Sequence, residues 1–285
     1  MVLLSNLKEN TMEPNPFIET ADNYRLLKIL GLAINANVGN KPNDVRHVDA
    51  QVFAIKCLSH VTSALHLLKG TISPEVGIDI LDASTILVAT RAALESLLAF
   101  SYVFIMPENA DDFDLRYDSW VRADLMERQA YEADIESHKE VKAADKMKIE
   151  ELQDKILKNS KFLSLSKRDR IRILGGEWRL KGWVPIAHDI RLEKNLIGST
   201  YSYLCSYSHS GYLSILQLRT AMTERRKAPP LEAIPSLLAY ITATMIKQHC
   251  KLFGTSRSAV VENKQTRDYL NKFLGDDPII VSDQA

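Results

Sequence analysis

The chain has 285 residues, of which 46% are apolar and 25% are charged, with 36 basic and 36 acidic side chains. This balance is typical of a globular protein with a substantial core, and it excludes a chain that is disordered throughout. Because the formal net charge is zero, a surface built everywhere to grip nucleic acid is also excluded, and only a local patch could bind it.

Cysteine usage and the N-terminus both indicate a cytoplasmic protein. The three cysteines, Cys57, Cys205 and Cys250, are widely spaced and each lies in an apolar helical pattern. That placement predicts reduced thiols in the core. The first ten residues hold no basic region and no apolar run of signal-peptide length, so we expect no export.

Two apolar stretches, 84–106 and 231–253, are long enough to cross a membrane. The first carries Arg91 and Glu95 near its middle, and the second carries Lys247, Gln248 and His249. Polar and charged side chains are costly at the centre of a bilayer. Both stretches are therefore predicted to be buried helices of a soluble protein, and no membrane partner is expected.

The predicted elements begin with an N-terminal extension, 1–40, that holds one short helix over 19–32. Asn43 or Asp44 can cap the next helix, which Gly70 ends. Its apolar positions recur every three to five residues and are predicted to face the core: Val48, Phe53, Cys57, Val61, Leu65 and Leu68. After a connection at Pro74 and Gly77, the most apolar helix spans 84–106, and a third helix runs from 111 to 131.

The segment 138–161 is rich in Lys and Glu at helical spacing and predicts an exposed helical arm. One stripe of this helix is predicted to be apolar: Val141, Ala144, Met147, Leu152 and Ile156. The arm could dock a partner helix, or its charges could simply form a solvated face.

The segment 162–189 is the least regular and contains two of the three tryptophans. Its basic cluster could bind phosphate locally or lie on a solvated helix: Lys167, Arg168, Arg170 and Arg172. Helix resumes over 192–223 with a bend at Gly198 or Gly211, a basic linker fills 225–230, and a core helix spans 236–253. The remainder, 255–285, is predicted to be a polar tail with a weak helix.

No segment alternates apolar and polar residues for long enough to demand a sheet, and no internal repeat is visible. The sequence therefore predicts an all-α fold, a helical bundle over 43–253 from which the charged arm 138–161 protrudes.

A narrow polar line crosses the apolar helix predicted over 84–106. At 100° per residue, Ser84, Arg91, Glu95 and Tyr102 fall within about 20° of one line. Unpaired charges are too costly to bury. This line must therefore be either an internal structural network or the wall of a cleft.

A second concentration of polar groups lies in 201–211. One predicted helix face carries Ser202, Ser206 and His209, and the next face carries Tyr203, Tyr207 and Ser210. A histidine among hydroxyls can serve acid–base or nucleotide-binding chemistry, although a helical bundle can also use such groups structurally.

The two polar regions are expected to meet. Arg91 and Glu95 need partners inside the protein, and the face around His209 is the other concentrated polar surface on an apolar helix. We therefore predict that the two helices pack side by side, with Arg91 or Glu95 within reach of His209, Ser206 or a tyrosine of 201–207.

Common catalytic and metal-binding motifs are absent from the sequence, including the P-loop, H-E-x-x-H, C-x-x-C and G-x-S-x-G. No metal and no cofactor is expected.

Three short elements carry a resemblance to a known family: T-R-A-A-L-E over 90–95, R-Y-D-S-W over 116–120, and the Trp183 region with the tyrosine-rich stretch ending at His209. Together they resemble, over about 78–218, an uncharacterised bacterial all-helical family, domain of unknown function family 5677. That family usually has a serine four residues before the histidine, where this chain has Cys205, and Ser206 stands three before it.

That family is in turn distantly similar to the HEPN superfamily, many of whose members are ribonucleases in toxin or phage-defence systems. The HEPN hallmark is an arginine four to six residues before a histidine, and no histidine of this chain has one. The sequence thus departs from the standard HEPN site, and ribonuclease chemistry of this kind would require a rearranged site in which Arg91 and His209 come from different helices.

Two hypotheses follow. In the first, a HEPN-like protein of bacterial stress or antiviral defence binds or cleaves RNA or a nucleotide in a polar cleft. Arg91 would hold the phosphate, His209 would act as general acid or base, and Glu95 would orient one of them. Further binding residues would be Tyr102, Tyr201, Ser206, Tyr207 and the basic cluster of 167–172.

An enzyme of this kind would be a metal-independent ribonuclease. In the second hypothesis the chain is a non-enzymatic interaction module with a structural polar network, and its partner is a helical protein or a second copy of the chain.

Overall fold

The protein is all-α, as the sequence predicts. The computed structural model describes residues 20–38, 45–69, 71–73, 78–80, 82–132, 135–192, 194–209, 211–224, 231–275 and 278–279. Several predicted caps and connections lie outside these residues, as does the hydroxyl of Ser210. They are Asn43, Asp44, Gly70, Pro74, Gly77 and 225–230. The chain forms two compact units, Met1–Phe100 with Ala187–Ala285, and Ser101–Ile186.

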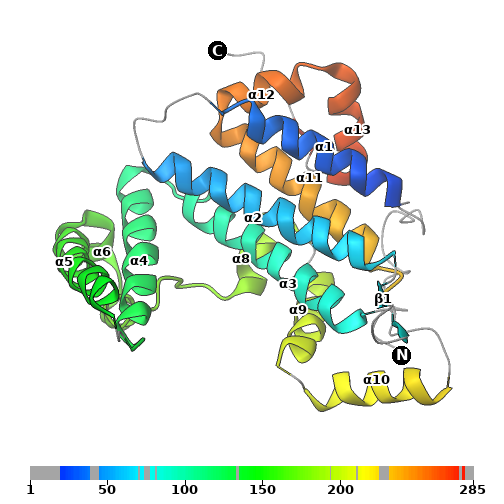
Figure 1. The fold of residues 1–285 in the computed structure, drawn as a ribbon. Helices are drawn as coiled ribbons and strands as arrows, with labels where there is room; N and C mark the ends of the chain where they lie inside the picture. The colour runs from blue at the N-terminus through cyan, green and yellow to red at the C-terminus, as the bar shows by residue number, and fades with distance from the viewer. Residues whose placement is uncertain are drawn as a thin grey trace. The chain divides into compact units, whose positions relative to one another are not determined.

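The first unit is built around helix α11, Ile234–Leu252, which is buried on nearly every side. Helix α1, Thr20–Asn35, lies along α11 (Figure 1) and places Leu26 and Leu30 in the core. The expected N-terminal extension is therefore wrong for residues 20–35, because α1 supplies a face of the core rather than an appendage.

Helix α2, Val45–Leu67, packs on helix α3, Ala83–Phe100, through small residues. Ala50, Ala54 and Cys57 are fully buried, whereas Val48, predicted for the core, is 43% exposed. Small side chains let two helices approach closely, and they form the first part of this face. Val61 and Leu65, further along α2, are fully buried as predicted.

A short antiparallel hairpin separates these two helices. Strand β1, Thr71–Ser73, pairs with strand β2, Ile78–Ile80, with Ile72 opposite Asp79. The sequence analysis missed it because three residues are too few to show an apolar–polar alternation.

Helix α3 continues directly into a π-helix, η2, Ser101–Ile105. Together, Ala83–Ile105 is long and apolar enough to cross a membrane by composition, and 72% of its most apolar stretch is buried inside the protein. A core helix meets the same criterion, and α3 packs in the first unit against α2, α9 and α11.

The C-terminal part of the first unit is more ordered than the predicted polar tail. Helices α12, Gly254–Val261, and α13, Lys264–Leu274, bury Val260, Leu270 and Phe273. Helix α12 also contacts α1 and α11. The tail expectation was wrong because these apolar residues, although sparse, repeat at helical spacing and form one face.

Helices α9, Lys194–Ser208, and α10, Tyr212–Glu224, complete the first unit. The predicted bend falls at Gly211, in the break between them, whereas Gly198 lies inside α9. The chain passes between the units within helix α8, Trp183–Asp189.

The second unit contains η2 and helices α4, Ala110–Gln129; α5, Glu136–Lys158; α6, Ser160–Ser164; and α7, Lys167–Leu174. Its core joins one apolar residue from each helix: Leu115, Ile156, Phe162 and Ile173. Arg122 ties the same helices together, because its Nη2 donates to Gln153 Oε1 at 2.7 Å and its Nη1 to the Leu174 carbonyl at 3.1 Å.

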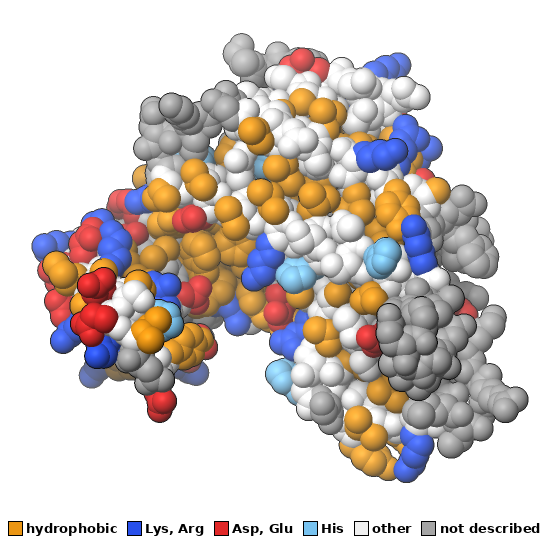
Figure 2. Space-filling model, in the orientation of Figure 1, with side chains coloured by type: hydrophobic (Ala, Val, Ile, Leu, Met, Phe, Trp, Pro, Cys, Tyr) orange, Lys and Arg blue, Asp and Glu red, His pale blue; other side chains and the backbone are white. Residues whose placement is uncertain are grey.

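The predicted arm, 138–161, corresponds to α5 and the start of α6, and it is solvated on most faces. Basic and acidic side chains intersperse over this part of the surface (Figure 2). Its buried line runs through Asp145, Leu152 and Ile156 and packs on α4. The predicted stripe is therefore wrong at Val141, Ala144 and Met147, which are exposed, and right at Leu152 and Ile156. Met147 is 73% exposed because it lies on the opposite side of α5 from the buried line.

Candidate functional site

The candidate site lies where α3 packs against α9, as the two polar regions of the sequence predict. Arg91 and Glu95 stand one turn apart on α3, and both the Nε and the Nη2 atoms of Arg91 lie 3.0 Å from Glu95 Oε1. The paired side chains are 18% and 29% exposed, respectively. The ion pair therefore holds the guanidinium in one orientation at the edge of the core.

Tyr201 on α9 completes this pair from the neighbouring helix. Its hydroxyl donates to Glu95 Oε1 at 2.6 Å, and its ring centroid is 5.7 Å from the Arg91 guanidinium carbon. Burial, followed by the hydrogen bond to the Glu95 carboxylate, raises the pKa of Tyr201. The phenol therefore stays protonated at neutral pH and acts as a fixed hydrogen-bond donor.

His209 lies at the exposed end of the site and contacts Arg91 there. Its Nε2 lies 3.3 Å from Arg91 Nη1, a contact between residues 118 positions apart. A guanidinium can only donate, so Nε2 is the acceptor and the imidazole proton is on Nδ1. This contact therefore requires neutral His209, since an imidazolium has no acceptor atom.

The position of His209 follows from the end of α9. The helix ends at Ser208, and the backbone amide of His209 donates to the Cys205 carbonyl at 3.1 Å. His209 is therefore held in the last turn while its side chain stays exposed. The cluster is neither sealed in the core nor fully open, because it reaches solvent at its His209 end.

Opposing influences act on the charge of Arg91. Burial is the largest influence and lowers its pKa, but the Glu95 carboxylate and the Tyr201 hydroxyl together outweigh it, so that the pKa is raised. Cys205 also contributes to the raised pKa values of both Arg91 and Tyr201. This half-buried thiol was predicted only as a core residue, and no sequence pattern distinguished it from the two buried thiols.

Ser206 lies on α9, the helix that carries Tyr201, and its buried hydroxyl has no hydrogen-bond partner among the described residues. A side chain at Gly211 would place its Cβ 3.0 Å from Ser206 Oγ and 3.3 Å from the Ser206 carbonyl oxygen. Glycine at 211 therefore leaves room for the turn that ends α9. Ser206 is close in sequence to His209, but nothing engages its hydroxyl.

Two predicted binding residues have other partners. Tyr102 lies in η2, in the second unit, where its hydroxyl accepts the Leu180 amide at 3.3 Å and its ring packs edge-on against Trp178. The chain passes from the first unit to the second between Phe100 and Ser101, so Tyr102 belongs to a different unit from Arg91. Tyr207 is buried and donates to Gln217 Oε1 at 2.5 Å on α10.

The side chains of the basic cluster on α7 do not all lie on one face of the helix. At 100° per residue, Arg170 lies well away from Arg168 and Arg172 around the helix. Arg172 is also paired with Asp169 at 3.2 Å and with Glu177 at 2.5 Å. The sequence left a phosphate-binding patch and a solvated helix as alternatives, and the patch stays a prediction. Lys167 and Arg168 are exposed.

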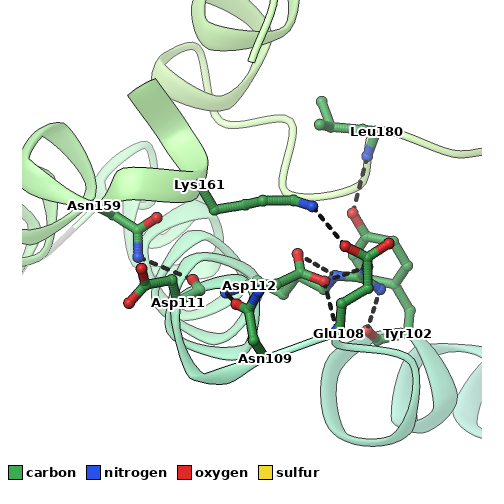
Figure 3. A network of polar contacts seen from close by, with 9 residues as sticks. Tyr102, Glu108, Asn109, Asp111, Asp112, Asn159, Lys161 and Leu180 are labelled. Atoms are coloured by element: carbon green, nitrogen blue, oxygen red, sulfur yellow. Dashed lines mark hydrogen bonds and ion pairs between the residues drawn. The ribbon is translucent and has the colours of Figure 1, made fainter. Parts of the chain in front are cut away.

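The sequence analysis also missed a polar network in the second unit, built from Asp112 and Arg116 on α4 and Lys161 on α6 (Figure 3). The R-Y-D-S-W element contains Arg116, and Asp112 stands four residues before it, at the spacing of a helical ion pair. The approach of Lys161 from α6 has no such local signal.

Comparisons with known proteins do not place this chain in a family: no family model, no curated protein and no solved structure matches it.

Proposed function

We propose that the chain is a HEPN-like helical protein of bacterial stress or antiviral defence. In this proposal Arg91 and His209 bind the phosphate of RNA or a nucleotide, and the protein cleaves RNA without a metal ion. The observation that carries the proposal is the contact between Arg91 Nη1 and the exposed His209 Nε2 at 3.3 Å. It pairs a phosphate-binding cation with an acid–base group at the protein surface.

A ligand would reach Arg91 at the edge that contacts His209. Glu95 occupies its Nε and Nη2 atoms, and Nη1 faces His209. A phosphate oxygen that takes the place of His209 Nε2 would accept from Nη1 while Glu95 keeps the guanidinium in place. Glu95 is thus a positioning residue, and Tyr201 fixes it from α9.

Displacement of that contact would release His209 Nε2 as a base. It would take the proton of the ribose 2′-hydroxyl, and the 2′-oxygen would then form a bond to phosphorus. The bond from phosphorus to the 5′-oxygen would break, and water would protonate that oxygen. The products would be a 2′,3′-cyclic phosphate and a 5′-hydroxyl, with Arg91 stabilising the charge that develops on the phosphorus oxygens.

The alternative is a non-enzymatic interaction module. One observation favours it: Arg91, Glu95 and Tyr201 satisfy one another without any ligand. In that case the cluster joins α3 to α9, and a helical protein or a second copy binds elsewhere.

A cleavage and binding assay separates the two. Fluorescent single-stranded RNA and an all-deoxy strand of the same sequence are incubated with the protein in EDTA, and nucleotides are tested by calorimetry. We expect cleavage of RNA alone, ending in a cyclic phosphate, with a rate that falls about 10²- to 10⁴-fold in His209→Ala. His138→Ala is the matched control, because His138 is an exposed histidine in the other unit.

Arg91→Met should weaken binding of both RNA and nucleotide. An inactive wild-type protein that binds neither ligand would favour the interaction module. Cleavage that survives in His209→Ala at the wild-type rate would identify a contaminating nuclease and reject the proposed site.

A further inference from the structure

The second unit contains a cavity of about 120 Å³ that the proposed function does not use. It lies between η2, α4, α6, α7 and the segment 175–181. Its walls are mainly apolar: Leu115, Leu165, Ile173 and Leu180, with the rings of Tyr102 and Trp178. An engineered apolar cavity of similar size, about 150 Å³, accommodates benzene. The space therefore suits a ligand with an aromatic-sized body.

One buried hydroxyl in this cavity has no partner. Ser119 is 4% exposed and lines the cavity from the middle of α4, and its Oγ makes no hydrogen bond with any residue that the structure describes. Other helical hydroxyls in the described chain donate to the carbonyl four residues earlier, as in Thr90, Ser96 and Thr242. Ser119 does not use this local alternative, so a ligand or solvent must satisfy it.

The ion pairs of Arg116 and Lys161 engage only some of the N–H groups of these two cations. Arg116 binds both oxygens of Asp112, at 3.0 and 2.8 Å, and donates to the Tyr102 carbonyl at 3.0 Å. Three of its five N–H groups are thereby engaged. Lys161 extends across the site to Glu108, 2.9 Å away (Figure 3), and this contact uses one of its three donors.

The acceptors, in contrast, are occupied. Asp112 Oδ2 accepts from both Arg116 and the Glu108 amide, and the Tyr102 hydroxyl accepts from Leu180. Arg116 and Lys161 can only donate, so their remaining capacity is for an acceptor, whereas the Ser119 hydroxyl can either donate or accept. Such a site favours a ligand that supplies acceptor oxygens and negative charge.

We propose that this cavity binds a small organic monoanion, a carboxylate with a flat apolar body about the size of a benzene ring. The body packs against Trp178 and the aliphatic walls, and the carboxylate meets Arg116 and Lys161. This inference stands independently of the Arg91–His209 cluster, which belongs to the other unit.

Ligands of one shape and different charge test the proposal. Benzoate, benzyl alcohol, benzylamine and inorganic phosphate are titrated into the full-length protein by calorimetry, with tryptophan fluorescence as a second readout. We expect benzoate to bind with a Kd near or below about 1 mM, and benzyl alcohol about tenfold more weakly. Benzylamine and phosphate should bind more weakly still, because one has the wrong charge and the other lacks the body.

Variants locate the site. Lys161→Met should weaken benzoate about tenfold and Ser119→Ala severalfold, and Ser119→Leu should abolish binding by filling the cavity. Lys155→Met is the matched control, because Lys155 is an exposed lysine on α5 paired with Glu151, and it should leave the Kd unchanged. Ser119→Ala removes only an unpaired hydroxyl, so it keeps the test valid if the leucine variant fails to fold.

Three results would overturn the proposal. They are a lack of benzoate binding at 10 mM, equal affinity for all four compounds, and wild-type affinity in both Lys161→Met and Ser119→Ala.

Discussion

His249 offers a test of how burial controls the stability of the first unit. It lies on α11, is fully buried, and neither ring nitrogen has a hydrogen-bond partner in the described part of the chain. Its ring packs on Phe253 with the centroids 4.5 Å apart. Burial lowers the pKa of His249 from 6.5 to about 4, because the charged form would lose its hydration.

The direction of the pH effect follows from this pKa. The unfolded chain takes up a proton near pH 6.5, whereas the folded chain resists it until about pH 4. The contribution of His249 to stability is therefore fully present above pH 6.5 and is lost as the pH falls to 4. A difference of one pKa unit between the folded and unfolded states corresponds to about 1.4 kcal/mol. The free energy of unfolding that is lost on acidification is therefore about 3 kcal/mol in total, of which about 2 kcal/mol is lost between pH 7 and pH 5.

We predict that His249→Leu removes this dependence. Wild-type protein should lose about 2 kcal/mol more free energy of unfolding between pH 7 and pH 5 than the variant does. At pH 7 the variant should be at least as stable as wild type, because an unpaired polar ring is replaced by an apolar side chain. His66→Gln, on an exposed histidine of α2, is the control and should keep the wild-type pH dependence.

The two units supply separate probes for the assay. All three cysteines lie in the first unit and all three tryptophans in the second. Urea unfolding is therefore followed by thiol reaction with 4,4′-dithiodipyridine and, in parallel, by tryptophan fluorescence. Only the thiol-detected unfolding should change in His249→Leu. Identical pH dependence in wild type and variant would refute the claim that His249 is desolvated.

Three further predictions concern local structure. Gly211→Ala should destabilise the thiol-detected unit by about 1–2 kcal/mol, because its Cβ would meet Ser206 at 3.0 Å; an unchanged urea midpoint would contradict the tight turn. Asn109→Ala should destabilise the fluorescence-detected unit by about 1 kcal/mol, since the Asn109 side chain caps α4 by accepting from the Asp112 amide. A urea midpoint equal to that of wild type would show that this cap does not stabilise the unit. In native protein at pH 8, one thiol per chain should react quickly, that of half-buried Cys205. The thiols of Cys57 and Cys250 are buried, with pKa values raised to about 12, and should react only on unfolding. Mass spectrometry identifies the labelled residue.

The helices themselves could be predicted from sequence because their signals are local. Apolar spacing and breakers place α1, α3 and α11 to within a few residues. The contact between Arg91 and His209 was also predictable. Each belongs to a polar region on an apolar helix, and such a region needs polar partners, which the other region could supply. The chemical role of that pair remains a proposal.

Tertiary structure alone decided which face of each helix is buried and where the polar groups without partners lie. Val48 and Met147 are exposed although they fit an apolar pattern. The buried hydroxyl of Ser119 has no hydrogen-bond partner among the described residues, although nothing distinguishes this serine in the sequence. Tyr102, placed on one line with Arg91 by helical spacing, belongs to the second unit and contacts Leu180 there. Burial depends on neighbours brought together from distant parts of the chain, and a local pattern gives the shape of a helix but not what packs against it.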